Sequence, residues 1–143
     1  MGLIGKGSRM SVDAIAANLA VVDTHIRGEA QDPASVMGLY TDDIVLEAPA
    51  SGLVLTDKAA IQANYIRIFS AIADVEIEPL DRFATADRVV DDCIVRCRLT
   101  ADGFADASYS VGDRIELRLL HVFHMRGGKI AREQVFESWK RLA

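Results

Sequence analysis

The sequence has few of the residues that build metal centres and disulfides, and it lacks a long apolar run. It has two cysteines and three histidines among 143 residues. The histidines show no metal-ligand spacing, because His121 and His124 would point to opposite faces of a strand. No apolar run approaches the ~20 residues that a membrane-spanning helix needs. We therefore expect no metal site and no membrane segment.

Positive charge is also scarce. The 21 acidic residues outnumber the 16 Lys and Arg residues, which gives a net charge of −5. Such a chain is a poor ligand for nucleic acid or for an anionic membrane surface. The glycine-rich first ten residues are too short for a secretion signal, and GKGS over residues 5–8 lacks the spacing of a phosphate-binding loop. We expect a cytoplasmic protein with no nucleic-acid partner and no cofactor.

The two cysteines, Cys93 and Cys97, are unsuited to a disulfide with each other. Four residues of β-strand span ~13 Å, about twice the Cα separation that a disulfide allows. We expect both to be buried structural thiols. Half of the residues are hydrophobic and 26% are charged, which is typical of one globular domain. We therefore expect a flexible tail over residues 1–10 and a single domain over residues 11–143.

The first half of the sequence has helical periodicity. Ser11 begins a predicted helix that ends near Arg27, with an apolar stripe of Val12, Ile15, Leu19, Val22 and Ile26. Asp32 and Pro33 favour the start of a short second helix. Thr56 favours the start of a third, with a stripe of Ile61, Tyr65, Ile68, Phe69 and Ile72. Between the last two, residues 44–48 predict a strand after a turn at residues 41–43.

The second half has strand periodicity. Strands are predicted over residues 75–85, 88–100, 114–125 and 129–139, with a polar loop at 101–113 and a tight turn at Gly127 and Gly128. Helices followed by an antiparallel sheet indicate an α+β domain, with the helices covering one face of the sheet.

In order along the chain, several runs resemble the SnoaL-like members of the NTF2-like superfamily. They are YTDDIV (40–45) followed by Glu47 and Pro49, EPL (78–80), DRVV (87–90) and HVFHMRGGKIARE (121–133). The resemblance implies an NTF2-like cone: three N-terminal helices packed in a curved mixed or antiparallel sheet around an internal pocket. It also implies a homodimer that pairs through the outer sheet face. The superfamily hosts isomerases, cyclases, dehydratases, epoxide hydrolases and non-enzymes, so the fold alone does not give the function.

The steroid isomerases of this fold provide one test of the resemblance. Matching their landmarks puts their carboxylate base at Ala48 and their two oxyanion donors at Thr24 and His121. Ala48 cannot accept a proton, so that mechanism is not carried over.

The epoxide hydrolases and polyketide cyclases provide a second test. The hydrolases need Arg-x-Asp on an internal strand, where this chain has Arg96, Cys97 and Arg98. The acid that both groups carry on the last strand falls at Val135, or at Gln134 if the turn shifts by one residue. Their known catalytic sets are therefore incomplete here.

His121 interrupts an otherwise apolar strand face that would line the cone. With a three-residue turn at 126–128, Glu133 would lie across from His121; with a two-residue turn, Gln134 would take its place. We favour the first register and predict that His121 and Glu133 form a general base and its orienting carboxylate. The alternative is an interior histidine whose hydrogen bonds are satisfied by a tyrosine, by Gln134 or by water.

Further side chains are predicted to line the pocket around a small apolar ligand. They are Tyr40, Tyr65, Phe69, Leu46, Ala48, Cys97, Phe123 and Val135, of which the three aromatic helix residues could instead serve core packing. The sequence thus predicts a small-molecule pocket protein. It would act as a cofactor-free acid–base enzyme of isomerase, cyclase or dehydratase type on an apolar carbonyl- or hydroxyl-bearing compound. The alternative is a non-catalytic ligand-binding or protein-association module.

Overall fold

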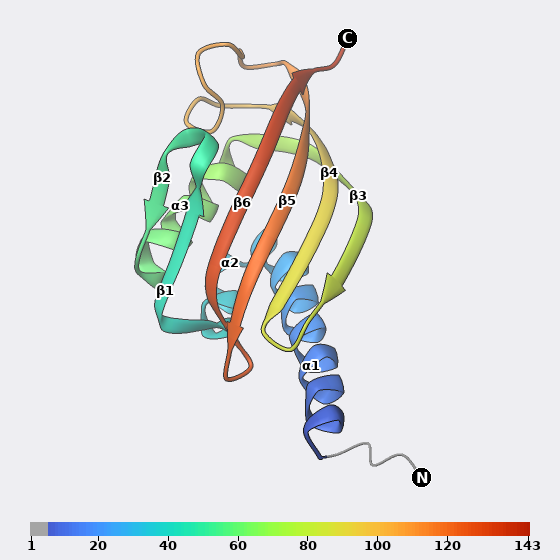
Figure 1. The fold of residues 1–143 in the computed structure, drawn as a ribbon. Coiled ribbons are helices and arrows are strands. Elements are labelled where there is room, and N and C mark those ends of the chain that lie inside the picture. The colour runs from blue at the N-terminus through green and yellow to red at the C-terminus, as the bar shows by residue number, and fades with distance from the viewer. Residues whose placement is uncertain (1–5) are drawn as a thin grey trace.

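Three helices cover one face of a six-stranded sheet in the computed structural model, which describes residues 6–143 (Figure 1). The helices are α1 (Lys6–Glu29), α2 (Pro33–Val36) and α3 (Lys58–Ser70). The strands are β1 (Tyr40–Ala48), β2 (Leu53–Leu55), β3 (Ile72–Ala84), β4 (Arg88–Leu99), β5 (Arg114–Arg126) and β6 (Lys129–Arg141). Their order is β2-β1-β6-β5-β4-β3, and every pair is antiparallel except β1 with β6. The predicted α+β architecture, with helices on one face of a mixed sheet, is confirmed.

Helix α1 begins earlier and buries a different face than the sequence predicts. It begins at Lys6, so residues 6–10 of the expected tail are helical, whereas residues 1–5 lie outside the described residues. Among residues 11–29 its buried residues are Asn18, Val22 and His25, while Val12 of the predicted stripe is 63% exposed. Figure 1 shows that the first turns of α1 project beyond the end of the sheet.

The junction of α1 and α2 is tightly packed. Gly28 lies in the last turn of α1, where a Cβ atom would approach Cγ1 of Val36 to 2.6 Å. Only glycine leaves room for this approach, because real Cβ atoms do not come so close to another carbon. Gly28 thus lies inside the helix, which runs to Glu29, and its role is to let α1 and α2 approach each other closely.

Three element boundaries also differ from the prediction. Strand β1 begins at Tyr40, not at residue 44, because residues 41–43 join the strand through an irregular register with β6. Asp57, not Thr56, is the N-cap of α3 and accepts a hydrogen bond from the backbone N–H of Ala60 at 2.8 Å. The three-residue strand β2, which pairs with β1, was not predicted because it is too short to have a period.

The β5–β6 hairpin contains a turn and a bulge. Gly127 and Gly128 form a two-residue turn with positive φ at both positions, as a tight hairpin requires. Beyond it the register shifts between His124 and Met125, so that β6 carries one extra residue. As a result His121 lies opposite Val135, and both predicted registers, with Glu133 or Gln134 opposite His121, are wrong. The bulge keeps Glu133 and Val135 on the inner face.

The interior has two apolar clusters. One joins the helices to the sheet and includes Val22, Ile44, Ile61, Phe123 and Ile130. The other lies toward the opposite end of the long strands and includes Cys97, Leu99, Ile115 and Leu117, with Phe104 and Trp139 packed against it. Both cysteines are buried and free, as the sequence predicts.

Candidate functional site

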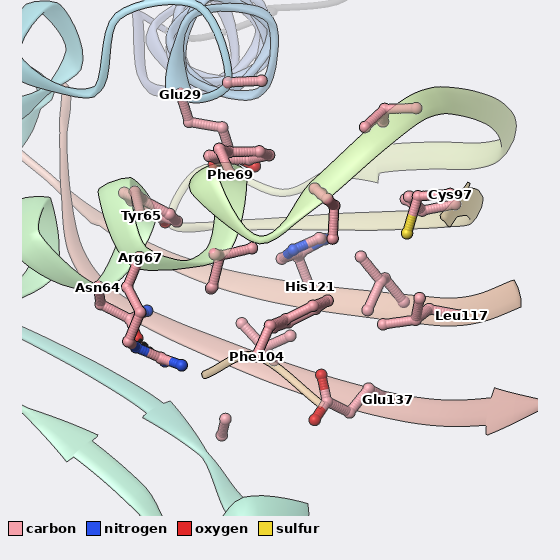
Figure 2. A pocket seen from close by; sticks show the side chains of 18 of the residues that line it. Glu29, Asn64, Tyr65, Arg67, Phe69, Cys97, Phe104, Leu117, His121 and Glu137 are labelled. Carbon is pink, nitrogen blue, oxygen red and sulfur yellow. Dashed lines mark hydrogen bonds between the residues drawn. The ribbon is translucent and has the colours of Figure 1, made fainter. Parts of the chain in front are cut away.

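A cavity of about 350 Å³ lies between α3 and the inner face of the sheet (Figure 2). Its walls are mostly apolar and include Ile68, Ile72, Leu117 and Leu119. Of the predicted pocket residues, six line it: Tyr65, Phe69, Leu46, Ala48, Cys97 and Val135. The prediction is wrong for Tyr40 and Phe123, which are fully buried behind the cavity wall because they pack in the helix–sheet core.

His121 reaches the cavity from β5. Its side chain is nearly buried, and its ring stacks on that of Phe123 with 5.6 Å between centroids. The nearest carboxylate is that of Asp91, the residue directly opposite on β4, with 3.7 Å between Nδ1 and Oδ2. That distance is too long for a hydrogen bond but suits an ion pair. Because Nδ1 faces Asp91, Nε2 is the ring nitrogen available to a molecule in the cavity.

Asp91 belongs to a chain of charges that runs from the surface to the cavity. It accepts a hydrogen bond from Nε of Arg82 on β3 at 2.7 Å. Arg82 in turn donates through Nη1 to Asp23 of α1 at 3.0 Å. Helix α1, the edge strand β3 and the inner strands β4 and β5 are thus connected through Asp23, Arg82, Asp91 and His121.

These charges set the protonation of His121. Burial alone would lower the pKa of its imidazole, but Asp91 and the buried Glu133 raise that pKa above its ordinary value. Burial opposes ionisation of Asp91 too, yet His121 and Arg82 bring the pKa of its carboxyl below the usual range. The site therefore favours an imidazolium facing a carboxylate. In the resting state such a ring can donate a proton.

Glu133 lies apart from His121, so the predicted pair between them is wrong. The bulge places Glu133 opposite Phe123, where its carboxylate accepts hydrogen bonds from Tyr40 Oη at 2.8 Å and Tyr65 Oη at 3.1 Å. Nε2 of His25 lies 3.6 Å from the same carboxylate and 3.0 Å from that of Glu29. This group of five side chains is here called the Glu133 cluster, and three of them, Glu29, Tyr65 and Glu133, line the cavity.

The Glu133 cluster holds both charges and neutral donors. Burial would lower the pKa of His25, but the charges and hydrogen bonds of Glu133 and Glu29 raise it to about 10. Burial would raise the pKa of Glu133, but the positive charge of His25 lowers it. Burial and the negative charge of Glu133 both raise the pKa values of Tyr40 and Tyr65. Each tyrosine therefore stays protonated and donates its single O–H to the carboxylate of Glu133. Glu133 is thus an ionised, fully partnered group and not a free base.

Glu137 is a second acidic group on the cavity wall. It lies on β6, one inward position beyond Val135 and therefore diagonal to His121 (Figure 2). Burial raises the pKa of its carboxyl, partly offset by Trp139 and His121. No carboxylate–cation pair within 4 Å joins it to the described residues. Glu137 can therefore exchange a proton with a molecule in the cavity.

The comparisons with known proteins give the family. The model of the SnoaL-like domain matches residues 19–133. The chain belongs to the SnoaL-like domain family. A comparison with curated protein sequences found no match.

Solved structures agree with the fold of this SnoaL-like domain. A candidate SnoaL-like polyketide cyclase from Jannaschia sp. CCS1 superposes with a TM-score of 0.76 at 15% identity, covering 87% of each chain. A phenazine biosynthesis-related protein from Pseudomonas aeruginosa has a TM-score of 0.73 at 19% identity, covering 89% of this chain and 78% of its own. An LEH-like epoxide hydrolase from M. tuberculosis has a TM-score of 0.67 at 13% identity, covering 87% and 84%. At these identities the likeness establishes the NTF2-like fold alone.

Sequence reasoning missed Asp91 and His25 as partners in this SnoaL-like domain. Asp91 has the same strand parity as Cys93, which indicates an inward side chain, but the pairing of β4 with β5 across a long loop could not be predicted. His25 follows Asn18 and Val22 at helical spacing and precedes Glu29 by four residues. That spacing was the signal, but the more apolar stripe concealed it.

Two groups of side chains offer metal-ligand atoms within 4.8 Å of one another. One is Asp91, Cys93 and His121; the other is His25, Glu29 and Glu133. A metal needs a thiolate and a neutral imidazole, yet burial and Asp91 raise the pKa of Cys93 to about 12, and His25 favours its proton. Both groups are thus organised as ion pairs.

Among the described residues, none of the helices has the length and apolarity of a membrane-spanning segment.

Proposed function

We propose that this SnoaL-like domain is a cofactor-independent acid–base enzyme acting on an apolar compound with a carbonyl or hydroxyl group. The observation that carries the proposal is His121 at the wall of an apolar cavity, with the carboxylate of Asp91 3.7 Å from its Nδ1. Perturbed titratable groups in a cleft are typical of catalytic sites. The chemistry is therefore proton transfer of the isomerase, cyclase or dehydratase type.

His121 acts as the general acid. Asp91 is a positioning residue, because it holds the Nδ1 side of the ring and stabilises the imidazolium without touching the substrate. The Nε2–H then donates to the carbonyl oxygen of the substrate. In an apolar cavity this donation stabilises developing negative charge more than it would in water. The expected contribution of such a group is about 10²–10⁴ in rate.

Glu137 acts as the base in the same reaction. It removes a proton from the carbon next to the carbonyl while His121 donates its proton to the oxygen, so an enol forms and no net charge is created. Diagonal cross-strand positions are ~7–8 Å apart, which leaves room for the reacting carbon and oxygen between the two groups. Return of the proton to a different carbon would complete an isomerisation.

Proton exchange on a model ketone tests the proposal without knowledge of the natural substrate. We expect the protein to accelerate deuterium incorporation next to the carbonyl of 2-decanone in D₂O, measured by NMR. His121→Gln and Glu137→Gln should each lower the protein-dependent rate by about a hundredfold. His124→Gln is the matched control, because His124 lies on the same strand but faces outward and contacts Gln134. Equal rates in the wild type, H121Q and buffer would contradict the proposal.

The second candidate function is ligand binding without catalysis. The mostly apolar cavity of about 350 Å³ favours it as well, since such a cavity can hold a small molecule with no chemistry. The same exchange assay separates the two functions: a binder would show a bound ketone with no accelerated exchange.

A further inference from the structure

Arg67 is a cation at the rim of the cavity that the proposed chemistry does not use. It lies near the end of α3, and Figure 2 shows it beside Asn64, on the side of the cavity where α3 runs. Its Nη2 donates to Oδ1 of Asn64 at 2.6 Å, and the Asn64 side chain is itself buried. That bond uses one of the five N–H groups of the guanidinium.

The remaining donors of Arg67 have no carboxylate partner among the described residues. Every other arginine with a described side chain, except Arg114, forms an ion pair with a carboxylate. Glu29 and Glu137 line the same cavity, but neither lies within ion-pair distance of Arg67. In a chain with excess acid, an arginine left unpaired beside a cavity is available to a ligand.

The loop between β4 and β5 passes near the stem of Arg67. Its Cγ lies 3.9 Å from where a Cβ atom of Gly103 would be, and Gly103 has a φ of +108° that favours glycine. The next residue, Phe104, lines the cavity. The head of Arg67 is thus held by Asn64, and its stem lies beside the β4–β5 loop. A side chain held in this way loses little conformational entropy when it binds.

We propose that Arg67 binds the carboxylate of an amphipathic ligand whose apolar body fills the cavity toward His121. The planar guanidinium fork matches a carboxylate with two parallel hydrogen bonds. The walls beyond it, including Phe69 and Leu119, are apolar and suit a hydrocarbon or ring body. The inference deepens the proposed function, because it names the substrate class as an acid with an apolar body that carries the reacting group.

The other charges of the cavity are compatible with an anionic ligand. Glu133 is compensated by His25, and Glu137 lies diagonal to His121, whose positive charge partly offsets its own. Glu29 contacts His25 at 3.0 Å. Arg67 is therefore a cation at the rim of the cavity, and the carboxylates that would repel an anionic ligand each have a positively charged side chain nearby.

Binding of matched ten-carbon probes tests the inference without any turnover. Trp139 is the only tryptophan and lines the cavity, so its fluorescence reports occupancy. We expect decanoate to bind the wild type about tenfold more tightly than decan-1-ol or decylammonium, as one exposed charge-assisted pair would give. Arg67→Gln should abolish the preference for decanoate and leave the affinity for decan-1-ol unchanged. Arg114→Gln is the matched control, since Arg114 also has no carboxylate partner but lies away from the cavity, and it should retain the preference.

The outcomes are distinct from those of the proton-exchange assay. Equal binding of decanoate and decan-1-ol by the wild type, tighter binding of decylammonium, or a preference that survives Arg67→Gln would each overturn the inference. His121→Gln should keep the decanoate preference even though it loses exchange activity. A protein that prefers decanoate but exchanges no ketone protons would support the anchor and refute the catalysis.

Discussion

At His25, burial and charge act on the pKa in opposite directions, and charge prevails. A fully buried imidazole would ordinarily be neutral. Two carboxylates within 3.6 Å of His25 favour its protonated form and raise its pKa to about 10. The unfolded chain would release that proton near the ordinary value of 6.5. Between these two values the folded protein binds one more proton than the unfolded protein does.

The free energy of unfolding should therefore depend on pH through His25. Its contribution is fully present below pH ~6.5 and is lost as the pH rises through about 10, because the raised pKa belongs to the folded state. His25→Gln should lower the free energy of unfolding at pH 7 by about 3 kcal/mol, the cost of leaving Glu133 without its charge partner. Urea denaturation at several pH values measures both effects.

The comparison of two proteins isolates this effect from other titrating groups. The difference in unfolding free energy between the wild type and His25→Gln should shrink as the pH rises from 6.5 to 10. A difference that stays constant over this range would mean that His25 is not protonated in the folded protein.

At the scale of single residues, sequence reasoning recognised chemistry but not pairing. It identified His121 as an interior polar group because it interrupts an apolar strand face, and Glu133 because one hairpin register would place it across from His121. It paired them wrongly, because the partner of His121 is Asp91. Asp91 lies on β4, and the sequence pattern of the long loop between β4 and β5 does not fix the register of these two strands. Partners contributed by separate elements follow from tertiary packing, which a single sequence does not state.

At the scale of elements, most helices and strands were predictable because each has a clear period. The bulge in β6 was not, because it adds a residue without changing the pattern of apolar positions. From the sequence we considered two hairpin registers and missed a third. In this third register the two-residue turn and the bulge together place Glu133 on the inner face. The close approach of α1 and α2 was hidden for a similar reason, since Gly28 reads equally well as a helix end.

Gly28→Ala should destabilise the protein by about 1–3 kcal/mol despite the better helix propensity of alanine. The new methyl group would lie 2.6 Å from Cγ1 of Val36, a buried and β-branched side chain that cannot easily move aside. Thermal or urea unfolding measures the change. Gly38→Ala is the control, because nothing lies within 4 Å of its Cβ position. Equal effects of the two substitutions would argue against a tight helix junction.

At the scale of the whole molecule, the outer face of the sheet combines apolar and charged side chains. Phe83 and Phe136 are 55% and 41% exposed there, and the strand register places Val90, Leu120 and Val122 between them. Ion pairs such as Arg118 with Asp92 surround this apolar area, here called the outer patch. An exposed apolar area with a polar rim is typical of a subunit interface.

We expect the protein to form a homodimer through the outer patch. Replacing Phe83 and Phe136 together by Asp should yield a monomer, because desolvating two new charges at the interface is costly. Val12→Asp is the control, since Val12 is 63% exposed on α1, which is not part of the sheet. Sedimentation velocity distinguishes the outcomes, and a wild type that sediments as a monomer at micromolar concentration would refute the expectation.

The charge chain from Asp23 to His121 makes the acidity of the cavity responsive to the outside. Asp23 is 42% exposed, so dissolved ions reach one end of a series whose other end is the buried imidazole. Screening by salt weakens the attraction between Asp23 and Arg82. The guanidinium of Arg82 then offsets more of the negative charge of Asp91, so Asp91 stabilises the imidazolium of His121 less. We therefore expect the ionic strength of the medium to adjust how readily the ring gives up its proton, with no ligand and no change of shape.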